Sequence, residues 1–248
     1  MARGAGTLLN MATIVIGSGL GVLLGGRLPD RTRMTVTDGL GLVTLVIGGL
    51  NVAALGDRDF GDAVGAGGTL LVVLGAVLIG GITGSLLQLE ARMERVGAWL
   101  QRRLATEGDS ASRARFVEGY VSASLVFVVG PLAVLGSLSD GLGRGIEQLA
   151  LKSTLDGFAS LAFAASLGWG VAASALTVGV FQGALTLVGA LLGGLLPAAL
   201  VSSVTATGGV LLLGVGLRLL NLKAVAVGDL LPALVVAPLL TALVSAVR

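Results

Sequence analysis

The chain alternates between long apolar runs and short polar segments. Eight of the runs lie at 5–27, 36–55, 65–89, 116–137, 153–173, 175–197, 205–220 and 225–247. Their length of about 20 residues is what an α-helix needs to cross a hydrocarbon core roughly 30 Å thick. The pattern therefore predicts an all-α integral membrane protein with about eight transmembrane helices.

One polar stretch, 90–115, separates the third run from the fourth. Apolar side chains recur in it at helical spacing, opposite four arginines. The apolar residues are Met93, Val96, Leu100 and Leu104, and the arginines are Arg92, Arg95, Arg102 and Arg103. The spacing predicts a cytoplasmic amphipathic helix on the membrane surface, with Trp99 near the headgroups. A solvated linker helix is the alternative.

Segment 21–48 resembles segment 189–216, which lies 168 residues further along the chain. Twelve of the 28 aligned positions are identical, whereas the residue frequencies of the chain would give about three by chance. The shared Gly21 and Gly25 form a small-xxx-small face suited to close helix contact. The first and second runs thus correspond to the sixth and seventh. Because five crossings separate the members of each pair, the copies are expected to form an inverted-topology repeat.

The repeat predicts how a single membrane domain, 1–248, is organised. Residues 1–89 form the first repeat half, and 90–115 form the amphipathic helix and linker. Residues 116–173 are the central spans, with a Gly-Pro break and a Lys-Ser-Thr-Leu-Asp-Gly element. Residues 174–248 form the second half.

Composition agrees with a membrane protein, since 54% of residues are apolar, 12% are charged, and mean hydropathy is +0.98. Cysteine and histidine are both absent, which excludes disulfides, thiolate or imidazole metal sites and catalysis by an imidazole base. We therefore expect no enzyme, no metal and no cofactor. The net charge of +2 gives no reason to expect a nucleic acid as partner.

The basic residues are unevenly distributed between the two sets of loops. Eleven of the 16 lie in the loops after the first, third and seventh runs, and five lie on the other side. By the positive-inside rule the first set is cytoplasmic, so both termini are expected to be external.

Polar groups inside the spans are the candidate site residues, because ionisable side chains at membrane depth are costly. Lys152, Ser153 and Asp156 begin the fifth run. Lys152 and Asp156 are four residues apart, so a local ion pair near the outer headgroups and a substrate site both remain open. Asn10 and Gln182 also lie within spans, where an interhelical hydrogen bond and a ligand contact are equally open.

Prolines within spans are a second indication of a site, because each frees a backbone carbonyl at membrane depth. Gly130 and Pro131 interrupt the fourth run, and Pro232 and Pro238 interrupt the eighth. Asp140 lies in a nearby stretch that is rich in glycine and too polar to face lipid. Interrupted spans in an inverted-repeat protein indicate a substrate or ion site near the midplane.

Three segments carry a resemblance to a known family: "GPLAVLGSLSDGLGRG" at 130–145, "LKSTLDGFASLAFAASLGWGV" at 151–171 and "LLLGVGLRLLNLKAVAVGDLLPALVVAPL" at 211–239. The chain resembles the bacterial membrane family called domain of unknown function 554. The resemblance covers nearly the whole chain and implies a shared fold in the bacterial inner (cytoplasmic) membrane. That family has no established activity, so the resemblance implies no chemistry.

The repeat, the interrupted spans and the sparse polar groups favour a secondary transporter of a small polar or carboxylate metabolite. The coupling ion, H⁺ or Na⁺, stays open, and so does assembly into a homo-oligomer. One alternative is a non-transporting scaffold or partner protein in the lipid bilayer, whose glycine faces would bind other helices. A small-ion channel is another, although no ring of like charges or repeated carbonyl filter is visible.

Overall fold

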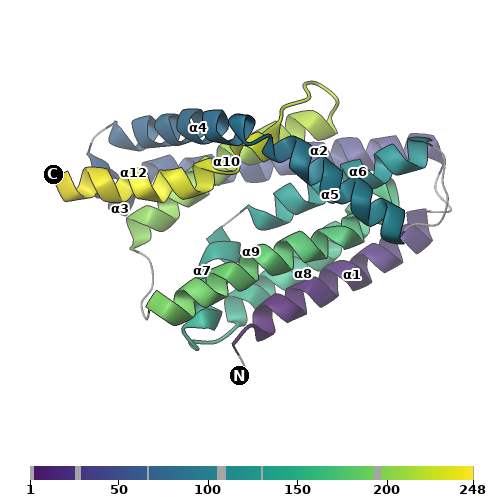
Figure 1. The fold of residues 1–248 in the computed structure, drawn as a ribbon, viewed down its shortest axis with the longest axis horizontal. Coiled ribbons are helices and arrows are strands. Elements are labelled where there is room, and N and C mark those ends of the chain that lie inside the picture. The colour runs from purple at the N-terminus through teal and green to yellow at the C-terminus, as the bar shows by residue number, and fades with distance from the viewer. Residues whose placement is uncertain are drawn as a thin grey trace. The chain divides into compact units, whose positions relative to one another are not determined.

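A computed structural model describes residues 3–25, 29–65, 67–104, 110–129, 131–192 and 197–247. The regular structure in these ranges is helical (Figure 1). The chain forms two compact units. Unit 1 comprises Met1–Gly41, Arg92–Val128 and Leu132–Leu195, and unit 2 comprises Leu42–Ala91, Val129–Pro131 and Leu196–Arg248.

Unit 1 is built around the close packing of two helices, α1 and α8. Its elements are α1 (Ala5–Gly25), the first part of α2 (Asp30–Val52), most of α5 (Leu89–Leu104), α6 (Ser110–Val128), α7 (Pro131–Gly141), α8 (Glu147–Leu167) and α9 (Gly170–Leu192). Side chains at Gly17, Gly21 and Gly25 of α1 would collide with backbone carbonyl oxygens of α8. The contacts advance along both helices together, so α1 and α8 are parallel. The close helix contact predicted for Gly21 and Gly25 is therefore made within the chain.

Helix α9 packs against α1 on another side and runs in the opposite direction (Figure 1). A Cβ at Gly179 would lie 2.5 Å from Met11 Sδ, while Trp169, near the start of α9, approaches Gly19 of α1. The crossing of α1 and α9 is therefore antiparallel. It buries Ile14 and Val178 completely.

Unit 2 consists of the rest of α2, the short 3₁₀ helix η1 (Ala53–Gly56), α3 (Arg58–Val64), α4 (Gly68–Leu86), α10 (Ala198–Leu219), α11 (Val227–Leu230) and α12 (Ala233–Val247). Helices α4 and α12 are antiparallel, since Gly75 approaches Leu240 and Gly80 approaches Ala233. Phe60, which is fully buried, anchors an apolar core shared by α3, α4 and α10. The small residues Gly80 and Ala233 allow the backbones of α4 and α12 to approach closely.

Six described helices are long and apolar enough to cross a membrane, or seven if the bent pair α6 and α7 forms one span. The predicted fifth span, 153–173, is not among them, and its boundaries are wrong. Helix α8 ends at Leu167, where Gly168 has a φ of 79°, and α9 starts at Gly170. A positive φ favours glycine, so this residue ends α8 inside a run that hydropathy treats as continuous.

The predicted breaks at proline have different outcomes. Helix α6 ends at Val128 and α7 begins at Pro131, with a bend of 67° between them, so this break is confirmed. Pro232 separates α11 from α12. Pro238, however, lies inside α12 without ending it, so the predicted interruption there is wrong. A proline removes one helical hydrogen bond, and the turns on both sides can persist.

Helix α5 confirms a helix in the predicted polar stretch. Gly97, Leu100 and Gln101 are buried, whereas Val96 and Trp99 are about half exposed. The guanidinium carbon of Arg103 lies 5.8 Å from the centroid of the Trp99 ring. The amphipathic character of α5 and its position on a membrane surface stay predictions.

Candidate functional site

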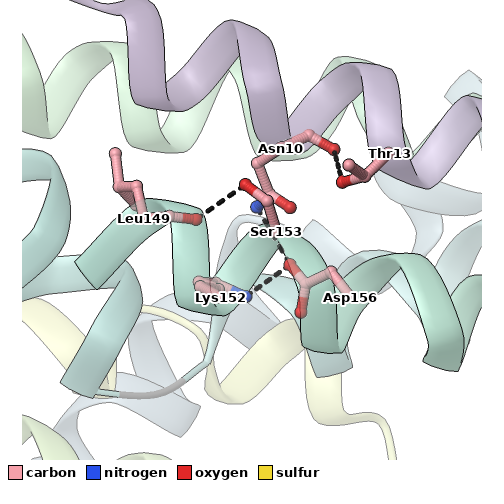
Figure 2. Close-up of polar contacts among 6 residues, drawn as sticks. All are labelled: Asn10, Thr13, Leu149, Lys152, Ser153 and Asp156. Carbon is pink, nitrogen blue, oxygen red and sulfur yellow. Dashed lines mark hydrogen bonds and ion pairs between the residues drawn. The ribbon is translucent and has the colours of Figure 1, made fainter. Parts of the chain in front are cut away.

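A buried charged cluster lies where α1 meets α8 in unit 1 (Figure 2). Lys152 Nζ lies 2.5 Å from Asp156 Oδ2, and the two side chains are 7% and 10% exposed. Asn10 of α1 donates from Nδ2 to the same oxygen over 2.9 Å. The ion pair is thus removed from solvent and joined to a second helix. One of the two alternatives for Asn10, an interhelical hydrogen bond, is realised.

Ser153, between the two charged residues, is buried but engaged within its own helix. Its hydroxyl donates to the carbonyl oxygen of Leu149 over 2.6 Å. Thr13 of α1 donates to the carbonyl oxygen of Asn10 in the same way, over 2.9 Å. Such bonds to the preceding turn satisfy a hydroxyl in an apolar interior. Figure 2 shows both of these bonds beside the charged cluster.

Asp140 of α7 lies against the N-terminus of α1. Its Oδ1 accepts a hydrogen bond from the Gly4 backbone N–H over 3.0 Å, and its Oδ2 accepts one from the Gly6 N–H over 3.1 Å. The first amides of a helix have no partner within the helix, and the positive end of its dipole favours an anion. Asp140 therefore acts as an N-terminal cap supplied by a different helix, which accounts for its burial.

Gln182 of α9 is fully buried. Neither Oε1 nor Nε2 has a hydrogen-bond partner within the described part of the chain. Gln182 follows Gly179, which contacts Met11 of α1, by one helical turn. Because α1 and α9 are antiparallel, Gln182 lies level with the turn of α1 just before Met11, close to the level of Asn10.

Three other predicted site residues lie outside the described part of unit 1. Pro131 begins α7 and is assigned to unit 2, and Gly130 lies outside the described residues. Pro238 belongs to α12 of unit 2. The structure therefore assembles Asn10, Lys152 and Asp156 directly.

Sequence reasoning missed a second polar network, in unit 2. Asp229 Oδ1 accepts from the Glu90 N–H over 2.9 Å, and Glu90 Oε2 accepts from the Gly228 N–H over 2.6 Å. Arg218 forms an ion pair with Glu90. The partners are more than 100 residues apart in sequence, so no local pattern could have indicated the network. It ties the start of α5 to α10 and α11.

Sequence reasoning also missed several buried hydroxyls. Thr7, Ser137 and Thr186, from α1, α7 and α9, have hydroxyl oxygens with no hydrogen-bond partner in the ranges that the structure describes. Nothing in the sequence distinguishes them from the many other Ser and Thr residues. Within the same ranges, no group of three or more Asp or Glu side chains could hold a metal ion.

The long apolar helices and the charged cluster buried among them are those of a multi-pass membrane protein. The chain belongs to the family described as protein of unknown function DUF554, whose model matches residues 5–242. Uncharacterized protein YqgA of Escherichia coli strain K12 is 30% identical over 237 residues, covering 96% of each chain. Uncharacterized membrane protein YdfK of Bacillus subtilis strain 168 is 26% identical over 235 residues, covering 94% of this chain and 93% of the relative. No solved structure matches.

Proposed function

We propose that this protein is a secondary transporter of a small polar or carboxylate metabolite, coupled to H⁺ or Na⁺. The observation that supports this most is the buried cluster of Lys152, Asp156 and Asn10 in unit 1. Charged groups at membrane depth are costly and typically line substrate or ion pathways. A purely structural helix pair would need neither charge, since apolar residues of similar volume often give equal or greater stability.

An inverted repeat is the second part of the proposal, and the helix boundaries support it. Shifted by 168 residues, α2 would span 198–220, and α10 spans Ala198–Leu219. Shifted in the same way, α1 would span 173–193, and α9 spans Gly170–Leu192. The repeat was derived from residue identities alone, so the agreement of the boundaries is an independent argument for it.

The contacts between repeat-related helices also support the repeat. Met11 and Gly179, which meet where α1 crosses α9, are 168 residues apart and hence occupy equivalent positions. Two helices related by an inverted repeat run antiparallel and meet at equivalent positions where the pseudo-two-fold axis passes between them. In unit 2, Gly48 of α2 approaches Gly209 of α10. Both glycines are among the repeat identities.

We further propose that α8 also crosses the membrane. The chain then has eight crossings, with the bent pair α6–α7 counted as one. Helix α8 has 21 residues. It follows α1 in parallel, from the contact of Leu149 with Gly6 to that of Ala165 with Gly25. If α8 crosses the membrane, α1 and α9 cross it in opposite directions. Their antiparallel contacts require this.

The glycine faces give the scaffold alternative little support. Gly17, Gly21 and Gly25 are covered by α8 of the same chain, so this face is not available to a partner protein. A ligand site requires groups that packing leaves unused, and the interior of unit 1 has them.

Ligand-dependent stabilisation tests the proposal, because a molecule that binds only the folded state raises its stability. The purified protein in detergent is heated with each member of a metabolite panel, and its unfolding midpoint is followed. A transporter should be stabilised by a small group of related compounds. Compounds tested at up to about 10 mM should reveal any ligand that binds with a Kd of about 1 mM or better. If none of them raises the unfolding midpoint, the result favours the scaffold.

A further inference from the structure

Buried polar groups of α1 and α9 outside the charged cluster indicate which class of ligand unit 1 would bind. Lys152 and Asp156 neutralise each other, and Asp140 is compensated by two amides and the positive end of α1. Each of these three buried charges therefore already has a partner. The atoms that lack one are neutral.

Two amide side chains provide three of the unpartnered atoms on α1 and α9. Asn10 uses Nδ2 to donate to Asp156, and its Oδ1 is an acceptor without a donor among the described residues. The orientation of this amide follows from chemistry, because a carboxylate can only accept. Gln182 presents an unpartnered acceptor, Oε1, and an unpartnered donor, Nε2. Both side chains are fully buried.

Helix geometry places these amides in one region of unit 1. Counting from the crossing of Met11 with Gly179, Gln182 is level with the turn of α1 between Thr7 and Asn10. Thr186 follows Gln182 by a further turn, and its backbone oxygen lies against Gly141 of α7. The hydroxyls of Thr7 and Thr186 add two groups that can donate or accept, neither with a partner in the described residues.

We infer that this region binds an uncharged ligand of the carboxamide or polyol class, with Gln182 and Asn10 as its recognition groups. The inference rests on the proposed transport function and narrows its substrate class. Asn10 Oδ1 and Gln182 Oε1 both need a donor, and a carboxylate has none. An ammonium group supplies donors but adds a charge, and the two buried acids described in this region, Asp140 and Asp156, already have partners. Carboxamides and polyols donate and accept without adding charge.

A substitution at Gln182 can distinguish a role in ligand recognition from a role in stability, because its amide has no hydrogen-bond partner among the described residues. A buried amide without partners destabilises the free protein, and an apolar side chain of similar shape removes that penalty. Gln182→Met should therefore raise the unfolding midpoint of the ligand-free protein while abolishing its response to ligand. Thr207→Val is the matched control, because Thr207 is a buried unpartnered hydroxyl in unit 2. It should leave the ligand response intact.

A series of four-carbon compounds tests the inference on the full chain in detergent. The probes are succinamide, erythritol, succinate and 1,4-diaminobutane, at equal concentrations up to 50 mM, about the range for weak fragment-sized ligands. Succinamide or erythritol should raise the midpoint of the wild type and of Thr207→Val by at least about 2 °C, and that of Gln182→Met by less than about 0.5 °C.

Three results would overturn the inference. Stabilisation by succinate or the diamine in place of the uncharged pair would overturn it while leaving the proposed transporter in place. A lack of response to all four compounds would also overturn it, and the metabolite panel would then decide separately whether the proposed function survives. A lower midpoint for ligand-free Gln182→Met would show that Gln182 stabilises the fold instead of recognising a ligand.

Discussion

Removing one charge of the buried pair should cost far more stability than removing both. The pair joins Lys152 Nζ and Asp156 Oδ2 at 2.5 Å, where Coulomb attraction is about 7 kcal/mol at an effective dielectric constant of about 20. Burial of each ion opposes this by several kcal/mol. Lys152→Met leaves the carboxylate with Asn10 as its one remaining donor within the described residues, and Asp156→Asn leaves the ammonium without a counter-charge. Each single variant should lose about 3–5 kcal/mol.

The double variant Lys152→Met with Asp156→Asn should lie within about 2 kcal/mol of the wild type, because no charge is left unpaired. It also keeps an acceptor at position 156 for the Asn10 amide. Reversible unfolding in mixed detergent micelles measures all four proteins, with the two tryptophans of the chain as fluorescent reporters. The cycle should give a coupling energy of at least about 3 kcal/mol.

An exposed ion pair would give a different result. Pairs four residues apart on a solvated helix contribute about 0.3–0.5 kcal/mol. Losses below about 0.5 kcal/mol in both single variants would therefore refute the reasoning from burial. If the double variant is folded, its transport should still fall at least tenfold, or about 1.4 kcal/mol. Normal transport by that variant would move the site away from α8.

Two other predictions concern the packing and the topology. Gly21→Ala should destabilise unit 1 in the same unfolding assay, because the added methyl group meets the backbone of α8. Gly49→Ala, with open space around it, should leave the stability unchanged. Equal effects of the two substitutions would contradict the close packing. Single cysteines at the exposed positions Ala198 and Gln148 should react with a membrane-impermeant reagent on intact cells, and one at the exposed Thr32 should react after permeabilisation; uniform labelling would refute the inverted topology.

The burial of Ser202 guides the choice of labelling positions. The loop before α10 is predicted to be external, and Ser202 would be a natural position from the sequence alone. In the structure its side chain is buried and donates to Asp57 over 2.5 Å. A cysteine there would report burial instead of sidedness, so Ala198 is the better position in the same segment.

The break at Pro131, where α7 begins, was predictable because proline fixes φ and fits the first turn of a helix. Helix α10 begins at Ala198, just after Pro197 and before the predicted start at 205, because Pro197 marks the start of the next helix as well as the end of the previous run. The turn between α8 and α9 was misplaced because the run from Phe158 to Leu196 contains no charged residue. There, backbone conformation at Gly168 decides the boundary, and hydropathy contains no information about it.

The members of the candidate site were partly predictable, but their arrangement was not. Lys152, Asp156, Asn10 and Gln182 stand out because polar groups inside apolar runs are rare. The contact of Asn10 with Asp156 joins residues 146 positions apart, and one sequence cannot reveal such a pairing. The burial of the ion pair likewise depends on α1 covering α8, which follows from tertiary packing of glycines.

Counterflow in proteoliposomes tests the central claim, that unit 1 holds the substrate site of a transporter, most directly. Vesicles preloaded with the uncharged compound that stabilises the protein best receive a trace of the same compound in labelled form. The wild type and Thr207→Val should accumulate label above protein-free vesicles, and Gln182→Met should accumulate at least tenfold less, about 1.4 kcal/mol in the binding term. Binding without counterflow in the wild type, or equal counterflow in all three proteins, would contradict the account.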